Sequence, residues 1–353
     1  MKIITCMWID KKLNIDAINY IKSWLEQDYS VVIFTYALPL SFSIINKICR
    51  NKNISIIDAN IILPYDDALK ILTPDGIERP EVANDPSYIG NLFYNKLNNK
   101  PKYKICIPSY NRLDGIKKTT LNLLKKYNID NIYIFVSTEK DYNDYKELGN
   151  IILVPEKHKG IGAVRSWIIN DWTNDKDNIV FIDDDIEMIK NKENIEVDLN
   201  ILIDNFFLKL IETDLYFGGL PLCSNAFFLK DKWTSTLKYI SGAIQFIRVD
   251  KSRNKIETTL RHYEDYYFDI MYFKRDKGIL RWNGCSPITK NYNIVGGICD
   301  EVGGLMNRLK DSEALADSII DKFGNKCVNK YFKKKSSRGP ATWNLRLNHH
   351  FKF

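Results

Sequence analysis

Short blocks of apolar residues recur along the chain in two different spacings. Continuous runs of β-branched and aromatic residues are typical of buried strands, whereas apolar positions three or four residues apart predict amphipathic helices. In the first hundred residues this pattern predicts strands at residues 3–8, 30–36 and 54–57 and a helix at residues 15–25. Because strands that alternate with helices form parallel sheets, we expect a small α/β unit here.

A second series of strands and helices begins near residue 101. Its strands are predicted at residues 103–107, 132–136, 151–154 and 179–182. Between the first two strands lies a predicted helix whose apolar face carries Ile116, Thr120, Leu123, Leu124 and Tyr127. The third strand precedes a predicted helix whose inner face carries Val164, Trp167, Ile168 and Trp172. The series predicts an α/β domain with a mostly parallel, Rossmann-like sheet and flanking helices.

A polar, Asn-rich stretch at residues 84–101 separates the two series and ends in Pro101, as is typical of a linker. We therefore place a small α/β domain at residues 1–98 and a larger one at residues 101–353. The chain has 353 residues, of which 45% are hydrophobic and 27% are charged. That balance excludes a mainly disordered chain, a collagen-like chain and a coiled coil.

No segment has the composition of a signal peptide or a membrane span. Residues 3–9 are at the lower limit of a signal's apolar region, and Pro39 interrupts the uncharged run at residues 29–46. The seven cysteines form no CxxC pair and are odd in number, which favours free thiols in a reducing compartment. The sequence predicts a cytoplasmic protein whose cysteines are small buried hydrophobic residues.

The net charge of +7 is distributed unevenly along the chain. Residues 1–100 carry 11 basic and 11 acidic side chains, residues 151–200 carry 6 and 11, and residues 301–353 carry 11 and 5. No acidic residue follows Asp321. The basic segment at residues 322–353 is either a binding surface for a polyanion or a solvated end of the chain. Its candidate contacts are Lys333, Lys334, Lys335 and Arg338.

Three consecutive aspartates, Asp183, Asp184 and Asp185, follow the strand predicted at residues 179–182. Like charges this close repel one another unless a cation or hydrogen-bond donors satisfy them. Ligands of open α/β sheets bind beyond the carboxyl ends of the strands, and carboxylate oxygens suit Mg²⁺ or Mn²⁺. We expect Asp183 and Asp185 to converge on a metal that bridges a diphosphate, with Asp184 pointing elsewhere. The alternative is a solvated acidic turn.

Other polar motifs follow the neighbouring strands. A glycine pair before a helix lets backbone amides approach a phosphate, and an arginine one turn along could pair with it, although such a pair is also found in ordinary turns. An acidic pair among aromatic residues is a candidate for deprotonating a hydroxyl, or simply a favourable helix N-terminus. The candidates are Pro108, Ser109, Arg112 and Glu139, then Gly160, Gly162 and Arg165, and finally Glu264 and Asp265.

The order of these motifs resembles that of GT-A glycosyltransferases over residues 101 to about 300. The segments are ICIPSYNR at residues 105–112, VSTE at 136–139, KGIGAVR at 159–165, FIDDDI at 181–186 and YEDYYFDI at 263–270. Within that superfamily the chain is most similar to the TET-associated, phage-type glycosyltransferases, which modify hydroxymethylated DNA bases. That family has a PSxxR-like start, a Gly-rich segment ending in Arg, a DD(N/D) motif, an NED-like acidic pair and a late GG, here Gly296 and Gly297.

The resemblance implies a role for each matching residue. The nucleotide would contact Pro108, Ser109 and Arg112, with Glu139 near the base or ribose, and the diphosphate or uracil would lie near Gly160, Gly162 and Arg165. Asp183, Asp184 and Asp185 would hold the ribose and the Mn²⁺ or Mg²⁺ ion. Asp265, beside Glu264, would be the base at the acceptor, near Tyr263, Gly296 and Gly297. GT-A metals often take a C-terminal histidine, so His349 or His350 is a candidate ligand or else a surface residue.

Three departures from the family pattern leave the acceptor open. Asp185 replaces a common Asn, Tyr263 precedes the acidic pair where Asn is frequent, and Tyr267 stands where a further acid is frequent. The N-terminal residues 7–10, 23–24, 31–36 and 58–64 resemble the opening of DXD-type sugar-binding transferases. No DxD motif follows before residue 100, and Asp66–Asp67 is a poor substitute, so we expect a truncated, non-catalytic half.

We therefore expect a metal-dependent glycosyltransferase that moves glucose or a pentose such as arabinose from a UDP-sugar to a hydroxymethylcytosine-type base in phage DNA, in the host cytoplasm. A base in duplex DNA would have to be flipped out of the stack. One alternative keeps the transferase but gives it a glycan, lipopolysaccharide or protein acceptor. Another is a non-catalytic module that binds a nucleotide sugar or DNA.

Overall fold

The computed structural model describes residues 2–8, 23, 26, 29–35, 54–58, 101–223, 225–289, 297, 303–334 and 341–353. The chain divides into two compact units. The first comprises Met1–Pro101 together with Ile195–Glu212, and the second comprises Lys102–Asn194 and Thr213–Phe353. Each unit is described by itself.

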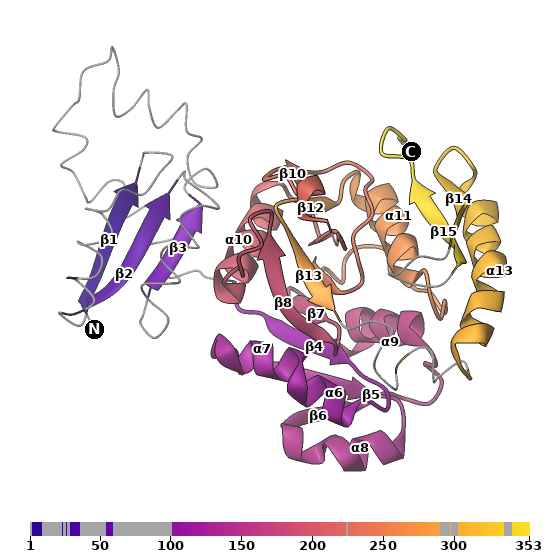
Figure 1. Cartoon of the computed structure of the whole chain (residues 1–353), viewed down its shortest axis with the longest axis horizontal. Helices are drawn as coiled ribbons and strands as arrows, with labels where there is room; N and C mark the ends of the chain where they lie inside the picture. The colour runs from indigo at the N-terminus through magenta and orange to yellow at the C-terminus, as the bar shows by residue number, and fades with distance from the viewer. Residues whose placement is uncertain are drawn as a thin grey trace. The chain divides into compact units, whose positions relative to one another are not determined.

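The first unit contains a three-stranded parallel sheet in the order β1-β2-β3 (Figure 1). Its strands are β1 (Lys2–Trp8), β2 (Tyr29–Thr35) and β3 (Ile54–Asp58), as the sequence predicts. The helix α10 (Leu199–Glu212) contacts β3 and belongs to this unit, although it lies far along the chain. Of the helix predicted at residues 15–25 only Ser23 is described, in helical conformation. Asp66 and Asp67 lie outside the described residues.

The second unit is built on an eight-stranded sheet in the order β10-β12-β9-β11-β7-β4-β5-β6. The half formed by β7, β4, β5 and β6 is parallel throughout, which confirms the Rossmann-like α/β fold. Next to it β11 is antiparallel to both β7 and β9. The strands are β4 (Lys104–Pro108), β5 (Ile132–Val136), β6 (Asn150–Leu153), β7 (Asn178–Ile182), β9 (Phe217–Gly219), β10 (Trp233–Thr234), β11 (Ile244–Arg248) and β12 (Leu280–Trp282).

Several of the connections between the strands of this unit contain helices. They include α6 (Leu113–Lys118), α7 (Thr120–Lys126), α8 (Glu139–Tyr145), α9 (Ile161–Trp167) with a π-helical turn at Ile168–Trp172, α11 (Glu264–Asp276) and α13 (Leu305–Phe323). No helix of the described ranges is long and apolar enough to cross a membrane. Of the cysteines whose side chains are described, Cys106, Cys285 and Cys327 are buried and all are free thiols.

The single helix predicted from Ile116 to Tyr127 is wrong, because the structure breaks it at Thr119. This residue has φ −113° and ψ −99°, outside the helical region. Its hydroxyl lies 2.7 Å from the carbonyl oxygens of both Gly115 and Asp184. The break therefore turns the chain so that a threonine side chain reaches the backbone after β7.

Two small two-stranded antiparallel sheets complete the second unit. The first pairs β8 (Ile186–Asn191) with β13 (Cys285–Thr289), and the second pairs β14 (Val328–Lys333) with β15 (Thr342–Leu347). Helix α13 packs beside β14 and β15 in Figure 1 and contacts both strands. The predicted basic segment at residues 322–353 therefore includes the paired strands β14 and β15.

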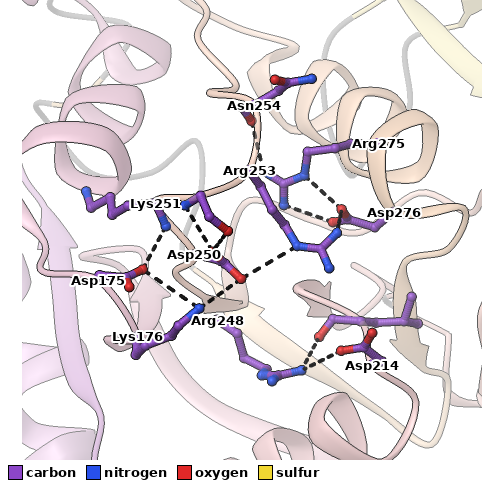
Figure 2. A network of polar contacts seen from close by, with 12 residues as sticks. Asp175, Lys176, Asp214, Arg248, Asp250, Lys251, Arg253, Asn254, Arg275 and Asp276 are labelled. Carbon is purple, nitrogen blue, oxygen red and sulfur yellow. Dashed lines mark hydrogen bonds and ion pairs between the residues drawn. The ribbon is translucent and has the colours of Figure 1, made fainter.

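A network of ion pairs lies at the end of the sheet where β7 begins (Figure 2). Just before β7, the Lys176 side chain lies 3.0 Å from the Asp250 carboxylate. The Arg253 guanidinium lies 3.7 Å from Asp250 and 3.0 Å from Asp276. The three aspartates of the sequence motif follow the opposite end of the same strand. The network thus stabilises the fold at a distance from that motif.

Candidate active site

A cavity of about 750 Å³ lies at the carboxyl ends of β4 and β7. The starts of α9 and α11 and the β14–β15 hairpin complete its walls. Most of the residues singled out in the sequence line it together: Pro108, Ser109, Arg112, Gly160, Arg165, Asp183, Asp184, Asp185, Tyr263, Glu264, Asp265, Gly297 and Lys333.

The backbone of the aspartate motif is held in place by two threonines. The Thr120 hydroxyl donates to Asp183 O at 2.6 Å and accepts from Ile186 N–H at 3.0 Å. Thr119 reaches Asp184 O from the helix break. Both threonines are buried, so these bonds are shielded from water and fix where the three carboxylates point.

Asp184 binds the loop that follows β4. Its carboxylate accepts from Ser109 Oγ at 2.6 Å and from Arg112 Nη1 at 2.7 Å. The Tyr145 hydroxyl lies 3.1 Å from Ser109 Oγ and accepts from Arg112 N–H at 2.7 Å. Because both Asp184 oxygens are engaged, this residue positions Ser109 and Arg112 rather than facing the cavity with an open carboxylate.

The other two carboxylates of the motif line the cavity and are each also paired with an arginine, Asp183 with Arg165 at 2.7 Å and Asp185 with Arg112 at 3.6 Å. The Asp183 side chain is 37% exposed. Asp185 is buried, and its Oδ1 has no hydrogen-bond partner among the described residues. Loss of solvation raises the pKa of Asp183 to about 6, with Arg165 opposing the shift. Loss of solvation and the neighbouring Asp183 and Asp184 raise the pKa of Asp185 to about 7.

These two carboxylates fit a divalent cation. An unpartnered buried carboxylate oxygen beside a second carboxylate offers hard ligands, and a cation would remove the repulsion that raises both pKa values. No group of three His, Cys, Asp or Glu side chains suited to a metal occurs in the described part of the chain. The remaining ligands would come from substrate phosphate and water, as is common for Mg²⁺.

The C-terminal histidines are not brought to the aspartates. His349 lines a separate cavity of about 370 Å³ with Lys238 and Arg346. His350 is exposed, and the two imidazole rings lie 4.2 Å apart. Burial and the neighbouring His350 and Lys238 lower the pKa of His349.

Arg165 connects the aspartate motif to the acidic pair. Its side chain is 1% exposed, and Nη2 donates to Asp183 Oδ1 at 2.7 Å and to Gly242 O at 2.9 Å. Its Nη1 lies 3.3 Å from Glu264 Oε1 and from Gln245 Oε1. The guanidinium is therefore enclosed by acceptors of the protein, and the carboxylates of β7 and α11 face a common cavity.

The two carboxylates of the acidic pair at the start of α11 lie in different environments. Burial and Asp265 raise the pKa of Glu264 to about 8, with Arg165 opposing the shift. Asp265 accepts from the Tyr239 hydroxyl at 2.7 Å and from Tyr266 N–H at 2.9 Å, while burial raises its pKa. Glu264 is thus held against Arg165, and Asp265 is oriented by two donors at the cavity wall.

Two glycines allow close approach around this cavity. A Cβ on Gly162 would lie 2.5 Å from Leu260 O, and its N–H already donates to that oxygen at 3.1 Å. Gly297 has φ +71°, and a Cβ there would lie 2.7 Å from the Arg112 guanidinium. The absence of a side chain at Gly162 therefore lets α9 pack against the segment before α11. The absence of one at Gly297 leaves space for the Arg112 guanidinium.

The remaining predicted site residues lie outside this constellation or outside the described residues. Glu139 is exposed at the start of α8, and Ser137 lines the cavity in its place. Lys334 is exposed and does not line the cavity. Gly296, Lys335 and Arg338 are not described.

Sequence reasoning missed the residues that position the others. Thr119, Thr120, Tyr145 and Tyr239 act through hydrogen bonds to partners far along the chain. None belongs to a spaced motif, and the apolar periodicity places the adjacent threonines only within a helix.

The mostly parallel, Rossmann-like sheet, with carboxylates at the end of β7 around one cavity, is consistent with a GT-A-like fold. The profile of the TET-associated glycosyltransferase family matches residues 103–291, more than half of the chain, and the chain belongs to this family. A search of curated proteins finds no match. The protein is therefore a glycosyltransferase.

Proposed function

We propose that this protein transfers glucose or a pentose such as arabinose from a UDP-sugar to the hydroxyl of a hydroxymethylcytosine-type base in DNA, with Mn²⁺ or Mg²⁺. One observation carries the proposal: Arg165 contacts both Asp183 and Glu264, so the carboxylates after β7 and the acidic pair of α11 line the same cavity. A transferase needs such an arrangement because donor and acceptor must meet.

On the donor side, Asp183 and Asp185 would hold the cation, which when bound supplies positive charge to the diphosphate. Ser109 and Arg112 are fixed at the end of β4 by Asp184, where a nucleotide of an α/β protein binds. Arg112 lines the cavity with its guanidinium held 2.7 Å from Asp184. These residues would orient the UDP group before transfer.

On the acceptor side, Asp265 is the proposed base. In an inverting reaction its carboxylate takes the proton of the acceptor hydroxyl, the hydroxyl oxygen forms a bond to the anomeric carbon, and the bond to UDP breaks. Tyr239 Oη and Tyr266 N–H orient Asp265 from the protein side. Glu264, with a pKa of about 8, would support Arg165 and Asp183 rather than take the proton.

The DNA acceptor rests on the resemblance of the sequence motifs to transferases that modify DNA bases and on charge. Lys333 of β14 lines the cavity, and the next residue, Lys334, is exposed. Cations at the mouth of a cavity would meet the phosphates that flank a target base.

The test is a transfer assay with purified protein, Mn²⁺ and labelled UDP-glucose or UDP-arabinose. Acceptors are hydroxymethylcytosine DNA, the same DNA with cytosine, and lipopolysaccharide. We expect label only in the hydroxymethylated DNA. Label in lipopolysaccharide alone would assign a glycan acceptor, and no UDP binding or turnover of any donor would assign a non-catalytic module.

A further inference from the structure

Two consecutive phenylalanines are exposed in the second unit. Phe227 is 82% and Phe228 is 67% exposed, and their rings lie edge to face with centroids 5.5 Å apart. Exposed aromatic side chains of this size, adjacent to one another, are typical of a surface that contacts a ligand or partner. Neither residue takes part in the site described above.

The turn that carries the two rings is held by hydrogen bonds. Ala226–Phe228 form a 3₁₀ turn, and the Asn225 side chain accepts from Phe227 N–H at 3.0 Å. Leu229 is buried directly after the turn, and Lys230 N–H donates to Asn283 O at 2.9 Å. The turn is therefore fixed at both ends while its rings point away from the protein core.

This turn continues from the rim of the active-site cavity. Leu222 lines the cavity, and Cys223 N–H donates to the hydroxyl of Ser286 at 2.8 Å. The next two residues after Ser286, Pro287 and Ile288, also line the cavity. The phenylalanines thus follow the cavity-lining Leu222 by five and six residues along the chain.

Two basic residues follow the turn in the sequence. Lys230 and Lys232 are both exposed. Asp231, between these two lysines, accepts from Trp282 Nε1 at 3.0 Å. Apolar rings followed by lysines complement stacked bases flanked by phosphates.

We propose that Phe227 and Phe228 form a wedge that enters duplex DNA beside the target base and fills the space left when the base turns into the cavity. The inference rests on the proposed DNA acceptor. Apolar side chains inserted between base steps unstack and kink a duplex, and flipping a base costs a few kcal/mol that such insertion offsets. A single-stranded acceptor needs no wedge, because its base is already unstacked.

The test compares duplex and single-stranded hydroxymethylcytosine DNA of one sequence, with wild-type protein and the double variant Phe227→Ala/Phe228→Ala. The matched control is Tyr142→Ala, an exposed aromatic residue on α8, which contacts β6 at the other edge of the sheet. We expect the double variant to lose roughly 10-fold or more in kcat/KM on the duplex and less than about 2-fold on the single strand. A 2-aminopurine next to the target base should brighten with wild type and Tyr142→Ala but not with the double variant.

Equal losses on both DNA forms, or no loss, would overturn the wedge. If the double variant alone fails to bind phosphatidylglycerol vesicles while its duplex to single-strand ratio is unchanged, the rings belong to a membrane contact instead. A wild-type protein that transfers to neither DNA form contradicts the proposed function itself, and is thereby distinguished from failure of the wedge alone.

Discussion

Arg165 donates a hydrogen bond to Asp183 at 2.7 Å from a position almost fully removed from solvent. The sequence motif predicts that this arginine faces a diphosphate. The structure instead surrounds it with Asp183, Glu264, Gln245 and the carbonyl of Gly242. Its positive charge therefore balances two carboxylates of the protein and fixes their relative position.

Replacing Arg165 should be costly for stability as well as activity. Arg165→Ala leaves Asp183 and Glu264 without their shared cation, and loss of one partner of a buried ion pair costs about 3–5 kcal/mol. Urea unfolding measures this change. Lys255→Ala is the control, because Lys255 is 60% exposed and its pair with the half-exposed Asp171 is 3.4 Å apart, for which a cost under about 1 kcal/mol is expected. Equal costs for the two variants would contradict the bridging role.

Asp185 should be required for turnover and dispensable for folding. Asp185→Ala removes a carboxylate whose Oδ1 has no protein partner among the described residues and whose Oδ2 is only 3.6 Å from Arg112, which keeps its 2.7 Å contact with Asp184 in the variant. We expect Mn²⁺-dependent transfer to fall by roughly two orders of magnitude or more, with the melting temperature retained. Glu187→Gln, two residues further along and not lining the cavity, is the control. Undiminished activity of Asp185→Ala would rule out the metal assignment.

Thr120 should set the position of the aspartate motif. Thr120→Val keeps the side-chain shape but leaves Asp183 O and Ile186 N–H without their hydroxyl partner, at a cost of about 1–3 kcal/mol. We also expect a higher Mn²⁺ concentration for half-maximal activity, because the carboxylates would no longer be held. The exposed Thr236 provides the control Thr236→Val. If Thr120→Val lowers stability but leaves the Mn²⁺ dependence of activity unchanged, Thr120 contributes to folding and does not position the carboxylates for the metal.

The buried Asp269 should make stability depend on pH. Burial and the nearby Asp265 raise its pKa well above 3.8, against the opposing charge of Arg281 and the hydrogen bond from Ile240 N–H. A raised folded-state pKa contributes stability that is full below the unfolded pKa and is lost as pH rises through the folded pKa. Asp269→Asn keeps the acceptor for Ile240 and cannot ionise.

Melting temperatures between pH 5 and pH 8.5 test this assignment. The advantage of Asp269→Asn over wild type should grow as pH rises. The exposed Asp144→Asn should follow wild type at every pH. A constant difference between Asp269→Asn and wild type would mean that burial does not raise the folded-state pKa of Asp269 into or above this range.

The lysines of the β14–β15 hairpin should contribute to DNA affinity through phosphates. Lys333→Ala/Lys334→Ala should weaken binding to any duplex and reduce the salt slope, by roughly 0.9 for each phosphate that is no longer neutralised. Fluorescence anisotropy from 50 to 200 mM salt measures the slope. Lys125→Ala/Lys126→Ala on α7 removes the same charge from exposed positions that do not line the cavity. Equal slopes for the two pairs would assign the effect to net charge alone.

The parallel half of the fold and the motif residues could be predicted because their information is local. Runs of β-branched residues identified β4, β5, β6 and β7, and the strand-end rule placed Ser109 and Asp183 at one edge. Whether a carboxylate faces a ligand or another side chain depends on residues far along the chain. Asp184 is engaged by Ser109 and Arg112, and Arg165 by Glu264, over separations of 72 to 99 residues.

No local sequence pattern predicts the helix break at Thr119 or the assignment of α10 to the first unit. Thr119 leaves the helix because its hydroxyl reaches the backbone after β7, a contact that no apolar periodicity records. The apolar pattern of α10 predicts burial but not the sheet against which it packs, and the structure assigns it to the unit of β3.

The central claim is that one cavity combines a metal-dependent donor site with a base at Asp265. Mass spectrometry of nucleosides from hydroxymethylcytosine duplex DNA, after incubation with UDP-sugar and Mn²⁺, tests it most directly. Wild type should add one hexose or pentose per modified base, and Asp265→Asn should bind UDP with Mn²⁺ normally yet add almost none. Full transfer by Asp265→Asn, or no mass change in wild type with any UDP-sugar, would contradict the account.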